Sequence, residues 1–170
     1  TCHELGFETI LPDAMWFPEC GDWRWDPQRF PGGSQPIEQF VHQHGMKLAL
    51  WCAWSNGGIS EHPEALSVRG PSGRPDWFNS DFKPDWKPGP FYGGQICLGS
   101  PAAKEWAIRK TQWLVLHHKL DYLKHDCGPI VTQCNKTDHR HKYGVDASYW
   151  ATMGYYEVQE KPGAVSGLPA

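Results

Sequence analysis

The sequence predicts an α/β fold in which short parallel strands alternate with helices. Three apolar stretches, at residues 7–11, 46–51 and 121–126, have the length and composition of buried strands. Each is followed by a long irregular segment rich in Gly, Pro and Trp, and then by a helical pattern. This order is typical of consecutive βα units, and we expect about three of them.

Two of the helices are placed by signals at their ends. The first follows Ser34, has Pro36 near its start and ends at Gly45, just before the second strand. The second covers residues 101–119, with Ser100 as a suitable N-cap and with Ala and Trp recurring at helical spacing. Both helices therefore lead directly into a predicted strand.

A third helix is expected to begin near Asp146. Tyr149, Met153 and Tyr156 are spaced i, i+4 and i+7, which gives this helix an apolar stripe. Residues 161–170 have no folding pattern, and we expect them to be an unstructured tail.

The connections between these elements are unequal in length. The turns from helix to strand are short, little more than Gly45 in one case and Lys119-Leu120 in the other, whereas the segments from strand to helix are long. In (β/α) barrels, the long loops after the strands build the active site. No glycine-rich phosphate loop follows any of the strands, which disfavours an open nucleotide-binding sheet. The sequence therefore predicts a partial (β/α)8 TIM barrel.

A closed barrel of this kind has about eight strands, and the sequence supplies about three. We expect residues 1–170 to form a fragment of a TIM-barrel catalytic domain, with the remainder of the barrel coming from missing sequence. Because an open set of strands leaves sheet edges unpaired, the fragment alone is expected to be marginally stable and inactive.

Composition excludes several classes of function. The formal net charge is -3 and the sequence pI is about 6.3, with no run of Lys and Arg, so we expect no nucleic acid partner. No apolar stretch approaches the roughly 20 residues of a spanning helix, so no membrane partner is expected either.

Aromatic residues are unusually abundant in the predicted loops. The chain has ten Trp, six Tyr and seven Phe, many of them in the stretches 13–34, 51–54 and 76–92. Such side chains can form the walls of a sugar-binding cleft, or they can attach long loops to the body of the domain. The sequence leaves both interpretations open.

The third predicted strand ends in Lys124 and Asp126, two residues apart and therefore on one face of the strand. Parallel strands in α/β proteins carry their chemistry at this end. A neighbouring ammonium group keeps a carboxylate ionised, so that it can act as a nucleophile. The alternative is a salt bridge that only closes the strand.

These strand endings are parts of a longer series of motifs that extends through nearly the whole chain. The motifs are Leu11-Pro12-Asp13-Ala14-Met15-Trp16-Phe17, Gly21-Asp22-Trp23, Asp26-Pro27, Arg29-Phe30-Pro31-Gly32-Gly33, Val41-His42, Gly45-Met46-Lys47, Leu50-Trp51 and Asp121-Tyr122-Leu123-Lys124-His125-Asp126. In this order they resemble the catalytic barrel of glycoside hydrolase family 36. The enzymes of that family are retaining α-galactosidases, with related α-N-acetylgalactosaminidases in the same clan.

The resemblance implies a role for each matching residue. Asp126 would be the catalytic nucleophile that attacks the anomeric carbon. Lys124 would bind sugar hydroxyls, and Asp13 would bind the hydroxyls that distinguish galactose. Trp51 would form a wall of the sugar site, and Trp16 would be a further substrate-binding aromatic residue. The implied substrate is a glycoside or oligosaccharide with a terminal α-linked galactose or a similar sugar, and no cofactor is implied.

The same resemblance places the second carboxyl group, the acid/base, on a later strand than those present here. It also shows departures, because Pro12 stands where the family commonly has an aspartate and His125 where it commonly has Trp. Alternation along the strand turns His125 away from the site, so we expect a packed, hydrogen-bonded histidine there.

Two functions from other classes are alternatives. The first is a non-catalytic carbohydrate-binding module, which the aromatic content favours and the strong helix at 101–119 disfavours, because such modules are usually β-sandwiches. The second is a structural metal-binding domain. Its ligands would come from a loop that we otherwise expect to be solvated and without a metal, and the candidates are Cys127, Cys134, Asp138, His139 and His141.

Overall fold

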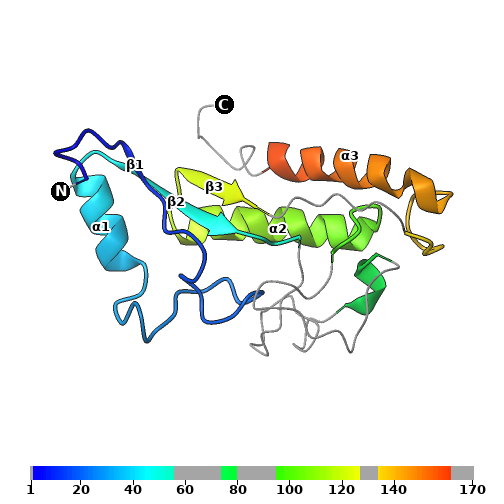
Figure 1. Cartoon of the computed structure of the whole chain (residues 1–170), viewed down its shortest axis with the longest axis horizontal. Helices are drawn as coiled ribbons and strands as arrows, with labels where there is room; N and C mark the ends of the chain where they lie inside the picture. The colour runs from blue at the N-terminus through cyan, green and yellow to red at the C-terminus, as the bar shows by residue number, and fades with distance from the viewer. Residues whose placement is uncertain (1, 56–73, 80–94, 127–133, 162–170) are drawn as a thin grey trace.

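The computed structural model describes residues 2–55, 74–79, 95–126 and 134–161 (Figure 1). Its elements follow the order that the sequence predicts, with strands and helices alternating. They are β1 (Thr9–Ile10), α1 (Gln35–Gln43), β2 (Lys47–Cys52), the short 3-10 helix η1 (Pro75–Trp77), α2 (Pro101–His117), β3 (Tyr122–His125), the 3-10 helix η2 (Gly144–Asp146) and α3 (Ala147–Glu160).

The three strands form one parallel sheet in the order β1-β2-β3, with β2 in the centre. Residues 48–52 of β2 are all buried, as expected of a central strand covered on both faces. In the register of β2 and β3, Trp51 lies beside Lys124 and Cys52 lies beside His125. The predicted partial (β/α)8 barrel is confirmed, and β1 is shorter than the predicted strand at residues 7–11.

Helices α1 and α2 begin and end close to their predicted limits. The hydroxyl of Ser100 accepts a hydrogen bond of 3.4 Å from the backbone N–H of Ala103, which confirms Ser100 as the N-cap of α2. Gly45 has a φ of 68°, a conformation that favours glycine, and this allows the turn from α1 into β2.

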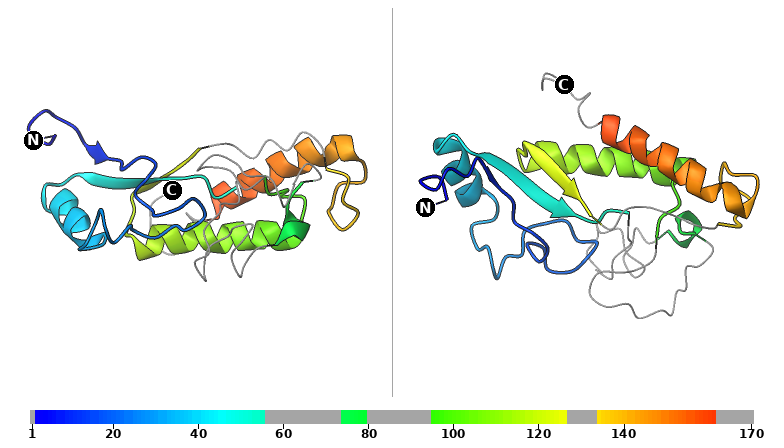
Figure 2. Two further views of the ribbon diagram at one scale, coloured as in Figure 1. Left: turned by 60° about the horizontal axis from the view of Figure 1, so that its bottom comes forward. Right: turned by 45° about the horizontal axis from the view of Figure 1, so that its top comes forward.

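Helix α3 lies beside α2 (Figures 1 and 2). Lys104 of α2 forms an ion pair with Glu157 of α3 across 2.6 Å. A Cβ atom built on Gly154 would lie 2.7 Å from the Cβ of Leu98, so glycine is what permits this close approach. Among the described helices, none is long and apolar enough to cross a membrane.

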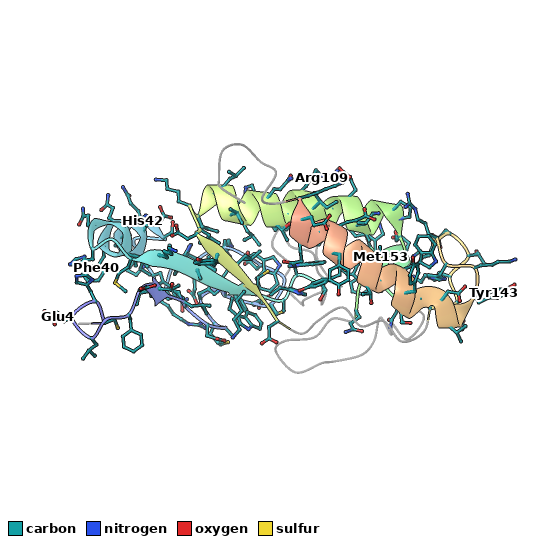
Figure 3. All side chains as sticks on the ribbon, turned by 90° about the horizontal axis from the view of Figure 1, so that it is seen from above. Glu4, Phe40, His42, Arg109, Tyr143 and Met153 are labelled. Carbon is teal, nitrogen blue, oxygen red and sulfur yellow. The ribbon has the colours of Figure 1, made fainter. Side chains whose placement is uncertain are left out.

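The apolar stripe predicted for α3 does not face the interior. Tyr149, Met153 and Tyr156 are exposed, and Figure 3 shows Met153 on the outer side of the helix. The buried residues of α3 are instead small or slender, namely Ala147, Ala151, Gly154 and Val158. At Gly154 the close contact with Leu98 leaves no room for a larger side chain, and Ala147 and Ala151 pack with Cys97 and Cys134. The face of α3 that lies closest to the body of the domain therefore carries small residues, and the bulky ones face outward.

The main core is rich in indole rings from the segment between β1 and α1. Trp16 and Phe17 are each 1% exposed, and Trp16 packs edge to face against His118 at the end of α2, with ring centroids 5.7 Å apart. Trp25 donates a hydrogen bond of 3.2 Å from Nε1 to Nδ1 of His118. Aromatic residues of this loop therefore attach it to the body of the domain, one of the two interpretations that the sequence left open.

Candidate functional site

The candidate site lies where the three parallel strands end. Trp51 is near the end of β2, Lys124 is near the end of β3, and Asp13 and Asp126 follow β1 and β3. The backbone N–H of Asp126 donates to the carbonyl of Cys52 across 2.9 Å, so β3 stays paired with β2 up to this carboxylate. Because all the strands are parallel, these side chains gather at one edge of the sheet.

Lys124 and Asp13 form an exposed ion pair at this edge. Nζ of Lys124 lies 2.9 Å from Oδ2 of Asp13, and the two side chains are 43% and 61% exposed. The hydrogen bond from Lys124 lowers the pKa of Asp13, and the same bond raises the pKa of Lys124. The negative charge of Asp126, which is close by, also raises the pKa of Lys124. The lysine thus joins the ends of the first and third strands.

Asp126 is exposed, and a donor from the neighbouring strand holds it. The indole Nε1 of Trp51 donates a hydrogen bond of 2.9 Å to its Oδ2 atom. A hydrogen bond to the charged form of a carboxylate favours that form and fixes the direction of its lone pairs. The site therefore presents an oriented carboxylate to solvent.

Trp51 itself is only 3% exposed, and its ring stacks on Phe17 with centroids 5.8 Å apart. Behind it, Nε1 of Trp16 donates a hydrogen bond of 2.7 Å to the backbone carbonyl of Trp51. Trp16 is 1% exposed and supports Trp51 from the core. Of the residues that the sequence places in the site, Asp13, Trp51, Lys124 and Asp126 come together, and Trp16 lies beneath them.

His125 points to the opposite face of the sheet, as its position in the strand predicts. Its ring stacks on Trp54, with centroids 4.6 Å apart, and its two nitrogens lie 3.3 Å from Oγ of Ser55 and 3.2 Å from the hydroxyl of Tyr155. Burial lowers the pKa of His125 to about 4. The prediction of a packed, hydrogen-bonded histidine is confirmed.

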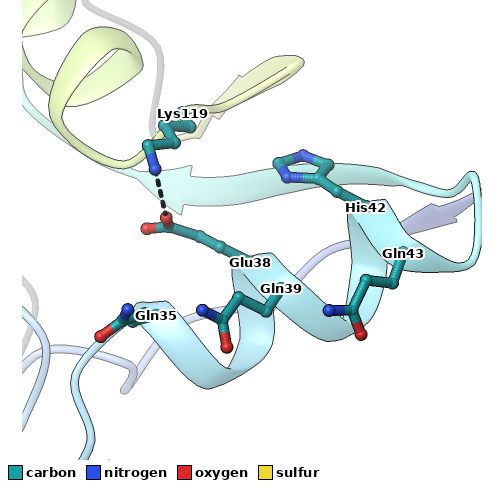
Figure 4. A pocket seen from close by; sticks show the side chains of 6 residues that line it. All are labelled: Gln35, Glu38, Gln39, His42, Gln43 and Lys119. Carbon is teal, nitrogen blue, oxygen red and sulfur yellow. Dashed lines mark ion pairs between the residues drawn. The ribbon is translucent and has the colours of Figure 1, made fainter.

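A separate hollow lies along α1, beside the turn that leads into β3 (Figure 4). Among the residues that line it, one ion pair is formed, between Nζ of Lys119 and Oε2 of Glu38 across 3.8 Å. Most of the other lining side chains end in amide groups. It shares no residue with the strand-end site. The lining residues are Gln35, Glu38, Gln39, His42, Gln43 and Lys119.

The Cys and His residues of the loop before α3 are arranged differently from the prediction. Cys134, His139 and His141 are buried rather than solvated, and they converge on Cys97, which precedes α2. The side chain of Asp138 is 66% exposed, and Cys127 lies outside the described residues. Sequence spacing missed Cys97 because it is far from the others along the chain.

Two features define the class of this protein. Long segments follow the strands of a parallel sheet, and carboxylates, a lysine and an indole gather at the carboxyl ends of those strands. The class is that of (β/α)-barrel domains with a polar site at the carboxyl-terminal edge. Residues 2–165 match the model of the glycosyl hydrolases family 31 TIM-barrel domain, and the chain belongs to that family.

Several individual relatives are α-galactosidases. The chain is 30% identical over 146 residues to α-galactosidase 2 of Pediococcus pentosaceus, a match that covers 79% of this chain and 19% of the relative. It is similar in fold to the α-galactosidase of Lactobacillus brevis, with a TM-score of 0.71 and 23% identity over 97% of this chain and 22% of that one.

A second solved structure is a variant of the GH36 α-galactosidase AgaA of Geobacillus stearothermophilus in complex with raffinose. Its TM-score is 0.71, with 18% identity over 96% of this chain and 23% of that one. The chain thus spans about a fifth of the length of the relatives that it matches.

Proposed function

We propose that this chain supplies the nucleophile side of the active site of a retaining α-galactosidase of the glycoside hydrolase family 36 type. Asp126 is the nucleophile. The observation that carries the proposal is the arrangement of Asp126, which is exposed at a strand end, accepts a hydrogen bond from Trp51, and lies near the Lys124–Asp13 ion pair.

In the first step, an oxygen of Asp126 attacks the anomeric carbon of the sugar. The bond from that carbon to the leaving oxygen breaks, and the leaving oxygen takes a proton from the acid/base, so a glycosyl ester of Asp126 remains. In the second step, the acid/base removes a proton from water, which attacks the same carbon and releases Asp126 as a carboxylate. Two inversions give net retention.

Lys124 and Asp13 bind the hydroxyl groups of the sugar in this proposal. An ammonium group donates hydrogen bonds and a carboxylate accepts them, so the pair offers both kinds of partner to a sugar that displaces solvent at this edge. A galactoside is the leading substrate, because several relatives are α-galactosidases and one structural neighbour was solved with raffinose.

Asp13 is a poor candidate for the acid/base. The acid must hold its proton near neutral pH, which requires a raised pKa, whereas the pKa of Asp13 is lowered by Lys124. We therefore place the acid/base outside the described residues, on a part of the barrel that the full-length protein provides. In this proposal, residues 1–170 are a fragment of the catalytic domain and need the rest of the barrel for turnover.

The test measures hydrolysis of an aryl α-galactoside by the full-length protein and by Asp126→Asn. We expect the variant to lose several orders of magnitude in kcat. Glu105→Gln is a control, since it makes the same acid-to-amide change on the exposed surface of α2, where Glu105 pairs with Arg109, and it should keep full activity.

A second variant, Asp126→Gly, separates a lost nucleophile from a lost fold. Azide can enter the space left by the carboxylate and attack the anomeric carbon from the same side, so we expect added azide to restore turnover and to yield a β-galactosyl azide. Full activity of Asp126→Asn, or an azide product with α configuration, would contradict the proposal.

A further inference from the structure

We propose that Cys97, Cys134, His139 and His141 form a structural zinc site, separate from the proposed active site. The two sulfur and two imidazole donor atoms all lie within 4.8 Å of one another. Two thiolates and two imidazoles are a ligand set that selects zinc and fills its tetrahedral shell.

The closest donor pairs already have the spacing of a zinc centre. Sγ of Cys97 lies 3.6 Å from Nε2 of His141, and Sγ of Cys134 lies 3.4 Å from Nδ1 of His139. Tetrahedral bonds of about 2.3 Å to sulfur and about 2.0–2.1 Å to nitrogen separate such ligands by roughly 3.6 Å. Binding therefore requires only a small contraction of the cluster.

The surrounding backbone orients one of the two imidazoles. Nε2 of His139 donates a hydrogen bond of 2.9 Å to the carbonyl of Asp76, which leaves the lone pair of Nδ1 directed toward Cys134. Histidine ligands usually bond through their second nitrogen in this way, because the bond fixes the tautomer and the ring orientation.

The site is also closed and close-packed. Cys97 and Cys134 are 0% exposed, and His139 and His141 are each 5% exposed. A Cβ atom on residue 99 would lie 2.9 Å from Cδ2 of His141, so Gly99 leaves the space that this ring occupies. No position remains open for water or substrate, which assigns the ion to folding rather than to chemistry.

Charge is balanced when the ion is bound. Two protein thiols lose their protons, two neutral imidazoles keep theirs, and the two thiolates neutralise Zn²⁺. The two released protons pass to solvent. A neutral centre can stay buried, whereas two unpaired thiolates in the same place would be costly.

The ligands come from two segments that follow neighbouring strands. Cys97 lies between β2 and α2, and the other three lie between β3 and α3. Asp76, which accepts the hydrogen bond from His139, belongs to η1 in the first of these segments. The ion would therefore tie together the loops that precede α2 and α3.

A disulfide between Cys97 and Cys134 is the competing state. Both cysteines are free thiols in this structure, and a disulfide would not account for two buried imidazoles directed at the same point.

The test is elemental analysis of the full-length protein, purified without chelator from cells supplied with zinc. We expect about one zinc ion per chain. Cys97→Ser should lose it, whereas Cys20→Ser should retain it, because Cys20 is a buried cysteine of the other core cluster and lies outside the proposed ligand set.

Replacement of the metal by Co²⁺ gives a second readout that does not depend on the folding of a variant. Tetrahedral coordination by two sulfurs and two nitrogens should produce intense visible ligand-field bands and a thiolate-to-cobalt charge-transfer band. A protein without metal and with a Cys97–Cys134 disulfide would overturn the proposal. So would zinc that stays bound in Cys97→Ser, or a different metal at this site.

Discussion

The indole N–H of Trp51 donates a hydrogen bond of 2.9 Å to Oδ2 of Asp126, although the two residues are 75 positions apart in the sequence. The pairing of β2 with β3 sets this distance, because Trp51 lies beside Lys124 and Asp126 follows two residues later on the same face. Trp51 thus acts on the proposed nucleophile as a hydrogen-bond donor, in addition to any contact with sugar.

Trp51→Phe removes this donor and keeps an aromatic ring in place. A hydrogen bond to a charged group contributes about 1.5–3 kcal/mol, so we expect kcat/KM for an aryl α-galactoside to fall by roughly ten- to a hundredfold. The matched control is Trp54→Phe, which makes the same change at another buried indole whose N–H has no hydrogen-bond partner among the described residues. Equal losses in the two variants would show that packing, rather than the hydrogen bond, is responsible.

Lys124→Met removes the Lys124–Asp13 ion pair and tests its effect on Asp13. Without the ammonium group, the pKa of Asp13 should rise toward its ordinary value, because the hydrogen bond from Lys124 is the largest cause of its lowering. Carboxyl ¹³C chemical shifts followed from neutral to acidic pH measure this change directly. We also expect KM for the galactoside to rise, and an unchanged titration of Asp13 would contradict the assigned cause.

Acid is expected to destabilise the fold through two buried histidines. Burial lowers the pKa of both His118 and His125 from the ordinary value of 6.5 to about 4. Between these values the unfolded chain binds a proton that the folded chain does not. The stabilisation from each neutral ring is therefore complete above pH 6.5 and is lost as the pH falls toward 4.

The loss should be on the order of 2 kcal/mol per histidine between about pH 7 and about pH 4.5. Urea denaturation at the two pH values measures it. His125→Phe keeps a ring on Trp54 but cannot titrate, so its free energy of unfolding should depend less on pH than that of the unmodified protein. Equal pH dependence in the two proteins would mean that His125 titrates normally.

Gly154→Ala tests the close contact between α3 and Leu98. Alanine favours the helix by about 1 kcal/mol, but overpacking a tight contact costs about 1–3 kcal/mol. The new Cβ would lie 2.7 Å from the Cβ of Leu98 and 3.0 Å from its carbonyl oxygen. Neither atom can be moved away by rotation of a flexible side chain. We therefore expect a net destabilisation of about 1 kcal/mol.

Thermal unfolding of Gly154→Ala measures that destabilisation. Met153→Ala is the neighbouring control on the exposed side of the same helix and should leave Tm nearly unchanged. A Tm higher in Gly154→Ala than in the unmodified protein would show that α3 can move away from Leu98 at little cost.

Much of the fold could be predicted from the sequence because its signals are local. Ser100, Pro101 and Gly45 mark helix ends through their own backbone chemistry, and these positions are confirmed. The buried face of α3 could not be predicted in this way, since it depends on how closely Leu98 approaches Gly154. Spacing alone predicted that Tyr149, Met153 and Tyr156 would form the buried face, but these three residues face outward.

The same division applies to the site. Parallel strands must place their ends together, so the meeting of Asp13 with Lys124 follows from strand order. The pairing of Lys124 with Asp13 rather than with Asp126 depends on side-chain geometry that sequence does not specify. Cys97 is a similar case, because only tertiary contact brings it beside His141.

The hydrogen bond from Trp16 to the carbonyl of Trp51 has a practical consequence for engineering. Two successive hydrogen bonds connect the interior of the domain to the proposed site, the first from Trp16 to Trp51 and the second from Trp51 to Asp126. If the proposed function is correct, we expect that redesign of the tryptophan-rich interior for heat tolerance will change turnover as well, so libraries of such variants should be screened for both properties together.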